Sequence, residues 1–206
     1  MRRILVATSN GGKIRDFIGA ALVHGVELDL LPDYKQIDPP IEDGDSFEAN
    51  ACLKAEYYSR HVPGQLVLAD DSGLAVDALG GAPGVRSARY ATDENGYTGN
   101  DIDDRNNALV LERMAQVPDG TRSGRFICVL ALARDGATLA TFSGKAEGVI
   151  LRSLRGDNGF GYDPMFYFPE IGKTFAELSA EEKSQYSHRG AAFRKFLDWA
   201  DSKMGA

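Results

Sequence analysis

The sequence predicts an α/β protein with a mixed central β-sheet flanked by helices. Three observations predict it. A short apolar run at Ile4–Ala7 is followed by a turn and then by a segment with one apolar face, the order of a strand, a loop and a helix. Arg125–Ala133 carries apolar residues at both alternating positions, which is typical of a strand covered on both faces. The chain ends on a second amphipathic segment. Its apolar face comprises Phe193, Phe196, Leu197, Ala200 and Met204.

The first helix is expected to begin at about Lys13, directly after the turn that follows the first strand. Its apolar residues fall at i, i+3, i+4, i+7 and i+8, which places them on a single face. They are Ile14, Phe17, Ile18, Ala21 and Leu22. A second strand is expected at Val26–Leu31, and a proline-containing loop should occupy Pro32 to Gly44.

A second helix and a third strand come next. Asp45 and Glu48 resemble a capping box, which predicts a helix from Ser46 to about His61. The apolar run Leu66–Ala69 predicts a buried strand. Gly73 to Tyr90 contains several glycines and a proline, and we expect it to be mostly loop.

The second half of the chain continues the same alternation. A helix is expected at about Asp101 to Gln116, and adjoining strands are expected at Thr138–Ser143 and Lys145–Leu151. Gly156 to Pro164 is a glycine-rich loop, and the capping box Ser179–Glu182 predicts a short helix before the final one. With 206 residues and no internal repeat, residues 1–206 are expected to form a single domain, with the loops able to divide it into two lobes.

The composition excludes several classes of function. Lysine and arginine number 23 against 30 aspartates and glutamates, a net charge of −7, which argues against binding polymeric DNA or RNA. No segment has the apolar length of a membrane span or a signal peptide. The two cysteines, Cys52 and Cys128, have no CxxC partner and indicate buried free thiols. We therefore expect a cytoplasmic protein.

Two adjacent carboxylates follow the third strand, in Asp70-Asp71-Ser72-Gly73. Unpaired buried charges are strongly disfavoured, and a hard divalent cation such as Mg²⁺ is a common partner for carboxylate oxygens. The alternative is an exposed Asx turn in which Asp and Ser cap the strand. These residues alone do not decide between a metal site and a capped turn.

A second candidate site is the turn between the first strand and the first helix. It comprises Thr8, Ser9, Asn10, Gly11, Gly12 and Lys13. The glycines allow close backbone approach, and the helix N-terminus together with a lysine suits a phosphate. The spacing is not that of a Walker A loop, and an ordinary strand-to-helix turn is the alternative.

A third group lies in and after the proline-containing loop. Glu42 precedes the helix that carries Asn50 and Lys54, which are four residues apart and share a helix face. Both side chains can point into a cleft. A solvated loop glutamate and a surface lysine are the alternatives.

The last candidates lie in the C-terminal third. Phe160 stands between two glycines in a loop, where it can stack on a nucleobase or plug the core, and Asp163 can accept hydrogen bonds from a base edge. Lys183 precedes His188 and Arg189, which fall at a helix start where cations oppose the helix dipole. A bound anion or a base carbonyl explains such cations, and a solvated helix end is the alternative.

These segments together resemble the Ham1/RdgB-type inosine triphosphatase family, and the resemblance runs nearly end to end. The matching motifs are ATSNGGK at Ala7–Lys13, SFEANACLKA at Ser46–Ala55, ADDSGLAVDALGGAPGVRSARYA at Ala69–Ala91, GFGYDPMF at Gly159–Phe166 and EKSQYSHRG at Glu182–Gly190. The resemblance implies an ITPase-like fold of two lobes with an active cleft between them. It implies hydrolysis of ITP, dITP and XTP to the monophosphate and pyrophosphate, with Mg²⁺ as cofactor and a homodimer as the assembly.

The resemblance also implies roles for the candidate residues. Thr8 to Lys13 hold phosphates, Ser72 touches the substrate, and Lys13 and Lys54 stabilise charge on the leaving group. Asp71 is the proton acceptor for the attacking water, and the metal residues are Glu42, Asp71 and, nearby, Asp70. The implied base-binding residues are Phe160, Gly161, Tyr162, Asp163, Lys183, His188 and Arg189. The related Maf-like pyrophosphatases, which act on other nucleotides, are the enzymatic rival. A nucleotide-binding regulator without catalysis is the rival from another class.

Overall fold

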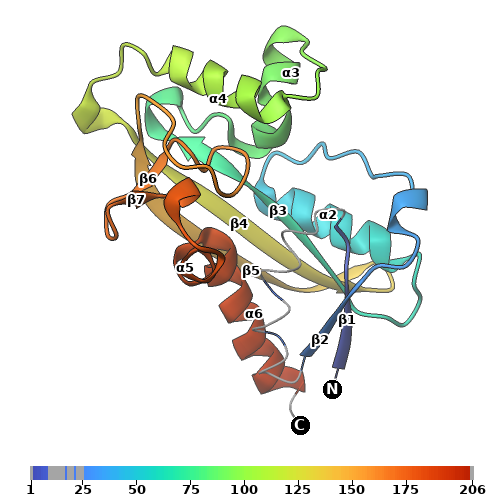
Figure 1. Ribbon diagram of the computed structural model, residues 1–206. Coiled ribbons are helices and arrows are strands. Elements are labelled where there is room, and N and C mark those ends of the chain that lie inside the picture. Colours follow the sequence, from blue (N-terminus) through green and yellow to red (C-terminus); the bar gives the residue numbers. More distant parts are fainter. Residues whose placement is uncertain (1, 9–16, 18–20, 22–25, 205–206) are drawn as a thin grey trace. The chain divides into compact units, whose positions relative to one another are not determined.

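The computed structural model describes residues 2–8, 17, 21 and 26–204. The chain divides into two compact units. Unit 1 comprises Met1–Asp71, Cys128–Gly144 and His188–Ala206, and unit 2 comprises Ser72–Ile127 and Lys145–Ser187. Figure 1 shows the strands and helices that the units contain.

Among the described residues the sheet has seven strands in the order β2-β1-β3-β4-β5-β6-β7. Their bounds are β1 (Arg2–Val6), β2 (Val26–Leu30), β3 (Val67–Val76), β4 (Ser123–Arg134), β5 (Ala137–Ile150), β6 (Phe166–Phe168) and β7 (Lys173–Thr174). β1 pairs in parallel with β2 and β3, whereas β6 pairs antiparallel with β5 and β7. The prediction of a mixed sheet flanked by helices is therefore confirmed.

Apart from α3, for which the sequence predicted no helix, the helices occupy the expected segments. They are α2 (Phe47–Ser59), α3 (Tyr90–Asn95), α4 (Ile102–Arg113), α5 (Ala180–Tyr186) and α6 (His188–Met204), with short 3-10 turns at Tyr34–Gln36, Asp77–Leu79, Gly84–Arg89, Asp119–Thr121 and Phe175–Glu177. The capping box of Ser179 and Glu182 starts α5 as predicted. Of the helix expected after Lys13, the structure describes only Phe17 and Ala21, and both are helical and buried.

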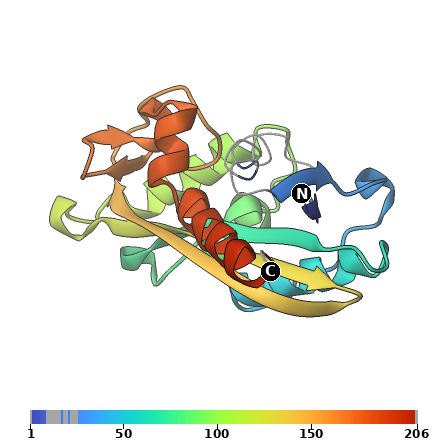
Figure 2. The same ribbon diagram turned by 90° about the horizontal axis from the view of Figure 1, so that it is seen from below.

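Unit 1 has two core clusters, one on each face of its strands. Figure 2 shows the ribbon of these strands with the red C-terminal helix α6 lying across them. Leu68 of β3 packs with Phe193 and Phe196 of α6 on one face. Val67 and Ala69 of the same strand pack with the α2 face on the other. This alternation follows from the two-residue period of a strand. Because both faces of the sheet are covered here, β4 is buried at both alternating positions.

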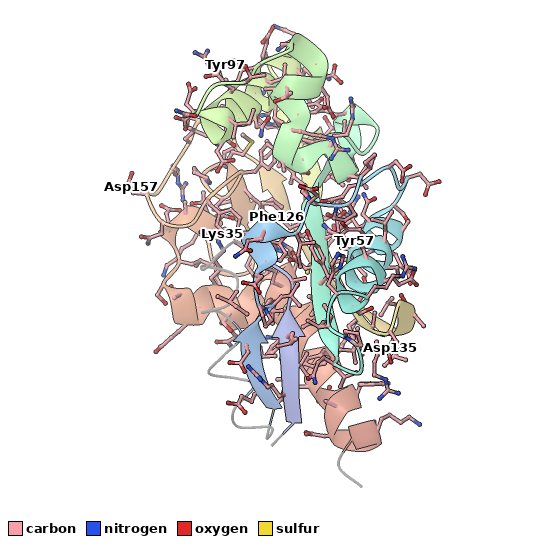
Figure 3. All side chains as sticks on the ribbon, turned by 90° about the vertical axis from the view of Figure 1, so that its right-hand side faces the viewer. Lys35, Tyr57, Tyr97, Phe126, Asp135 and Asp157 are labelled. Carbon is pink, nitrogen blue, oxygen red and sulfur yellow. The ribbon has the colours of Figure 1, made fainter. Side chains whose placement is uncertain are left out.

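Unit 2 has its own core, in which aromatic rings meet. Phe126, labelled in Figure 3, packs against Phe166 and Phe175 with ring centroids 4.6 and 5.6 Å away. Beside them the buried Arg122 donates hydrogen bonds to the carbonyl oxygens of Met114 (2.6 Å), Val117 (3.3 Å), Ile150 (2.7 Å) and Leu151 (3.0 Å). One guanidinium therefore ties the end of α4 to the end of β5.

Three sequence expectations about element boundaries are wrong. The strand at Leu66–Ala69 does not end at Asp70, because β3 continues through Val76. The residue that caps α2 is Ser46 and not Asp45, since the Ser46 hydroxyl accepts the Ala49 N–H at 3.2 Å. The segments on either side of Gly144 form one continuous strand, β5.

Gly144 does not break β5, and close packing against α6 explains why a glycine stands there. A Cβ atom at this position would lie 2.1 Å from the His188 carbonyl oxygen and 2.4 Å from the Ala192 nitrogen. A glycine inside a strand often marks such a close approach of another backbone.

None of the described helices is long and apolar enough to cross a membrane. Both cysteines are free thiols; Cys128 is buried and Cys52 half-buried.

Candidate active site

The first candidate group lies in unit 1, where Glu42 and Asp71 converge on Lys54. We call it the carboxylate–lysine group. The Lys54 ammonium donates to Asp71 Oδ1 at 2.9 Å and to Glu42 Oε2 at 3.0 Å. Lys54 comes from α2, Asp71 from β3 and Glu42 from the loop before α2. Three residues far apart in the sequence thus share one cation.

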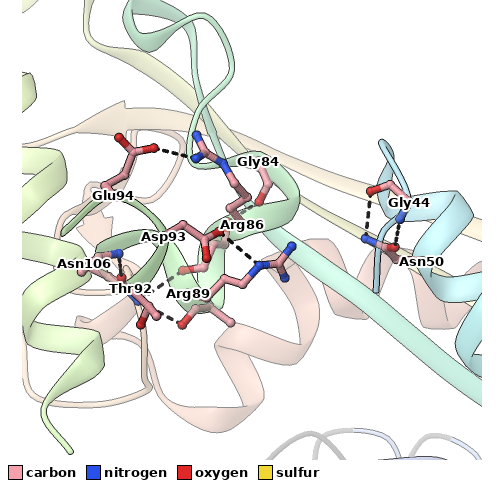
Figure 4. Close-up of polar contacts among 12 residues, drawn as sticks. Gly44, Asn50, Gly84, Arg86, Arg89, Thr92, Asp93, Glu94 and Asn106 are labelled. Atoms are coloured by element: carbon pink, nitrogen blue, oxygen red, sulfur yellow. Dashed lines mark hydrogen bonds and ion pairs between the residues drawn. The ribbon is translucent and has the colours of Figure 1, made fainter. Parts of the chain in front are cut away.

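Asn50 connects this group to the backbone of the Glu42 loop. Its side-chain oxygen accepts the Gly44 N–H at 2.8 Å, and its Nδ2 donates to the Gly44 carbonyl at 3.4 Å (Figure 4). The same Nδ2 lies 3.5 Å from Asp71 Oδ2. Gly44 is required here, because a Cβ atom would come within 2.5 Å of the Asn50 oxygen. The fully buried amide therefore fixes the loop relative to Asp71.

The Glu42 loop is also held to α2 at a second point. Tyr57, labelled on α2 in Figure 3, donates its hydroxyl proton to the Asp38 carbonyl at 2.9 Å. With Asn50 on Gly44, this anchors the loop on both sides of Glu42. A glutamate anchored in this way differs from the solvated loop glutamate that the sequence left open.

Burial and charge oppose each other within the carboxylate–lysine group. Burial is the largest single influence on the pKa of Asp71 and raises it, the adjacent Lys54 ammonium lowers it, and with Glu42 and Asp70 also raising it the net shift is upward. Burial alone would lower the pKa of Lys54, but the attraction of Asp71, Asp70 and Glu42 outweighs burial and raises it. Asp71 is therefore a stronger base than an exposed aspartate, beside a lysine that stays charged.

The two aspartates of β3 lie on opposite faces of the sheet. β3 runs through both residues, so their side chains alternate, and Asp71 takes the α2 face on which it meets Lys54 and Asn50. Asp70 takes the face on which Leu68 packs with α6. The capped-turn alternative for these residues is wrong, because the backbone is a strand. The alternation therefore directs the Asp70 side chain away from the Lys54 ammonium, although its charge still raises the pKa of Asp71 and of Lys54.

A divalent cation fits this donor set. No cluster of three or more His, Cys, Asp or Glu side chains suited to a metal occurs in the described part of the chain. Glu42 and Asp71 nevertheless converge on one cation, the Lys54 ammonium. One or two carboxylates completed by substrate phosphates are the usual ligands of Mg²⁺ in nucleotide sites, so two protein carboxylates match that pattern.

The second candidate group lies in unit 2, in the loop Gly159–Asp163. Phe160 is 39% exposed, although large aromatic side chains usually become buried. The Lys183 ammonium of α5 lies 4.9 Å from the centre of its ring, a cation–π distance. Lys183 also donates to Asp163 Oδ2, and the same oxygen accepts the Phe160 N–H at 2.9 Å. We call Phe160, Asp163 and Lys183 the aromatic-loop group.

Three further contacts fix this loop to the rest of unit 2. The Gly161 N–H donates to the Asp103 carboxylate at 3.0 Å, and the Asn107 amide donates to the Gly161 carbonyl at 2.9 Å. The buried Tyr162 hydroxyl donates to the Ser87 carbonyl at 2.7 Å. Gly161 adopts a φ of 60°, a conformation that favours glycine. The loop therefore presents Phe160 from a braced backbone and not from a mobile tip.

The structure places the other predicted site residues as follows. Thr8 is buried two residues after the end of β1, and Ser72 is half-buried in β3. His188 and Arg189 are buried at the start of α6, in unit 1. The predictions for Ser9, Asn10, Gly11, Gly12 and Lys13 lie outside the described residues.

Sequence reasoning gave no positioning role to three residues that hold these groups in place, although it named Asn50 as able to point into a cleft. Asn50 had a signal, since it stands four residues before Lys54 on one helix face. Asp103 and Asn107 had none, because their partners lie more than fifty residues away in the chain.

The fold and the two groups define an α/β protein with a buried carboxylate–lysine group and an exposed loop aromatic. Known proteins are similar to this chain in sequence and in fold. A model of the Ham1 family matches residues 4–199. A protein of Acidobacterium capsulatum named dITP/XTP pyrophosphatase is 53% identical over 196 residues, covering 94% of this chain and 96% of that protein. One of the same name from Geobacillus kaustophilus is 47% identical over 205 residues, covering 100% and 97%.

Solved structures agree with the sequence comparison. The Staphylococcus aureus Ham1 protein superposes with a TM-score of 0.84 at 35% identity, covering 98% of this chain and 100% of that one. A HAM1 protein from Coxiella burnetii gives 0.85 at 36% identity with the same coverage. The chain belongs to the Ham1 family.

Proposed function

We propose that this protein hydrolyses the noncanonical purine nucleotides ITP, dITP and XTP to the nucleoside monophosphate and pyrophosphate. The observation that carries the proposal is the convergence of Glu42 and Asp71 on Lys54, in a Ham1-family chain 53% identical to a protein named dITP/XTP pyrophosphatase. Such a group supplies both a base for water and positive charge for phosphate. Binding alone does not require two carboxylates beside a triphosphate, which argues against a regulator without catalysis.

Mg²⁺ is the proposed cofactor, and Glu42 and Asp71 are the residues that would hold it. Asp70, on the opposite face of β3, is not included in this set. When bound, Mg²⁺ would supply positive charge that neutralises the phosphates of the substrate.

The residues of unit 1 then divide the chemistry. Asp71 accepts the proton of the water that attacks the α-phosphorus, and its raised pKa suits that role. Lys54 donates to the oxygens on which negative charge builds as pyrophosphate leaves. The family resemblance assigns Thr8 to Lys13 to the phosphates. Lys13 would therefore stabilise the charge on the leaving pyrophosphate together with Lys54. Asn50 keeps the Glu42 loop and Asp71 in register.

The residues of unit 2 suit the base. Phe160 offers an exposed ring face for stacking, an interaction that contributes roughly 1–3 kcal/mol per base. Lys183 beside it is a donor for the 6-oxo group of hypoxanthine or xanthine. A 6-amino group leaves such a donor unpaired, which disfavours adenine.

His188 and Arg189 at the start of α6 retain the base-reading role implied by the family resemblance. The homodimer and the cytoplasmic location are proposed on the same resemblance.

A panel of nucleotides tests the proposal. Pyrophosphate release is measured for ITP, dITP, XTP, ATP, dTTP and UTP, with Mg²⁺ and with a chelator. The proposal expects the three noncanonical purines to give the highest kcat/KM and expects the chelator to abolish turnover. Faster turnover of dTTP or UTP than of ITP and XTP would favour the Maf-like alternative and contradict the proposal.

A further inference from the structure

Asp163 stands at the centre of the aromatic-loop group, although the sequence suggested that it contacts a base edge. Its side chain is 5% exposed. One carboxylate oxygen, Oδ2, accepts both the Phe160 N–H at 2.9 Å and a proton of the Lys183 ammonium. Asp163 therefore touches both residues that are proposed to meet the base.

Gly159 closes the loop around that oxygen. A Cβ atom at Gly159 would lie 2.1 Å from Asp163 Oδ2 and 3.1 Å from Lys183 Nζ. The glycine also adopts a φ of 81°, which other residues rarely take. The backbone thus packs directly on the carboxylate and the ammonium, and Oδ2 already accepts two protein donors.

Lys183 needs such a holder if it is to read a base. A lysine side chain is flexible and its ammonium has three equivalent donors, so an unrestrained lysine discriminates poorly. Here one donor is used by Asp163, and the nitrogen is held 4.9 Å from the centre of the Phe160 ring. A base stacked on Phe160 would then find the remaining lysine protons in a fixed place.

We infer that Asp163 is a positioning residue that sets the preference for 6-oxo over 6-amino purines by holding Lys183 beside Phe160. The inference rests on the proposed function, in which Phe160 stacks on the base and Lys183 donates to its 6-oxo group. Asp163 itself does not contact the base. Its carboxylate carries the charge that fixes the lysine.

Asp163→Asn is the direct test, because it removes the charge while keeping the shape and an oxygen for the Phe160 N–H. Losing a hydrogen bond to a charged group lowers an equilibrium about tenfold to a hundredfold. We expect kcat/KM for ITP to fall by that factor, mostly through a higher KM, with kcat changed little. The ratio of kcat/KM for ITP to that for ATP should fall by a similar factor.

Asp103→Asn is the matched control. The Asp103 carboxylate also accepts a backbone N–H of this loop, that of Gly161 at 3.0 Å, but among the described contacts it does not reach Lys183. A role in loop anchoring alone predicts that both variants change ITP and ATP kinetics alike. A role through Lys183 predicts that only Asp163→Asn changes the ITP to ATP ratio.

A double-mutant cycle with Lys183→Met completes the experiment, with thermal melting to establish that each variant is folded. We expect Asp163→Asn to have no further effect on the ITP to ATP ratio once Lys183 is methionine. An equal effect in both backgrounds, or an equal effect of Asp103→Asn, would overturn the inference while leaving the proposed function intact. A wild-type protein with no preference for ITP over ATP would overturn the proposed function, and the inference with it.

Discussion

Replacing Lys54 by methionine removes the ammonium that Glu42 and Asp71 share, while keeping most of the length and apolar stem of the side chain. The side chains of Lys54 and Asp71 are only 13% and 12% exposed, so their contact is little screened by water. Glu42 is 34% exposed, and its contact counts for less. The variant leaves two carboxylates side by side with no cation between them.

The expected loss follows from these two contacts. A hydrogen bond to a charged group is worth about 1.5–3 kcal/mol when desolvated, and the more exposed pair adds at most about 1 kcal/mol. We therefore expect Lys54→Met to lower the free energy of unfolding by about 3 kcal/mol, in the range set by those two terms. For a chain of this size that lowers the melting temperature by roughly 6–12 °C.

The pH dependence has a definite sign. Without Lys54, burial raises the pKa of Asp71 still further above its value in the unfolded chain. A carboxyl whose pKa is raised on folding favours the folded state when protonated and loses that advantage as pH rises through the folded pKa. The stability deficit of the variant should therefore be largest at neutral pH and should shrink as Asp71 protonates in acid.

Differential scanning calorimetry of the protein in buffer that contains a chelator tests this prediction by measuring the melting temperature. Lys35→Met is the control. Lys35 is an exposed lysine of the same unit, labelled in Figure 3. The Lys35→Met substitution removes one positive charge without changing the carboxylate–lysine group. A melting temperature for Lys54→Met within about 2 °C of wild type, or an equal fall for Lys35→Met, would refute the reasoning.

Three further predictions concern single residues. Asp71→Asn should lower kcat about a hundredfold or more while nucleotide binding persists in titration calorimetry, because the general base is lost and the shape kept. Arg122→Met should cost about 2–4 kcal/mol in denaturant unfolding, since it leaves buried carbonyl oxygens without a donor. Arg155 lowers the pKa of Glu177 to about 2, so in Arg155→Gln that pKa should rise toward the usual range, as read from carboxyl chemical shifts. A carboxylate whose pKa is lowered on folding stabilises the folded state. In the wild-type protein the stabilisation from the Arg155–Glu177 ion pair is therefore lost only as pH falls toward the lowered pKa of Glu177.

Most of the order of elements could be predicted from the sequence because it depends on local pattern, but α3, β6 and β7 were not predicted. The alternation in Arg125–Ala133 and the capping box at Ser179 report burial and helix starts directly. Boundaries at glycines could not be predicted in this way. Gly144 and Gly73 suggest breaks, yet each lies inside a strand where another part of the chain approaches too closely for a Cβ atom. Sequence alone does not distinguish a glycine that turns the backbone from one that makes room.

The candidate residues could be listed from the sequence, but the sequence did not predict which of them contact one another or which position the others. That Asp71 and not Asp70 meets Lys54 depends on β3 continuing past both residues, which fixes the alternation. Asn50 and Asp163 position their neighbours through contacts with residues that local spacing only partly indicates. Polar residues that act through other side chains need three-dimensional contacts to be recognised.

The most direct test of the account is the fate of oxygen from water. Hydrolysis of ITP is run in ¹⁸O-labelled water, and the products are separated and weighed by mass spectrometry. If Asp71 directs water to the α-phosphorus, the monophosphate carries one heavy oxygen and the pyrophosphate carries none. Label in the pyrophosphate, or release of orthophosphate in place of pyrophosphate, would contradict the account.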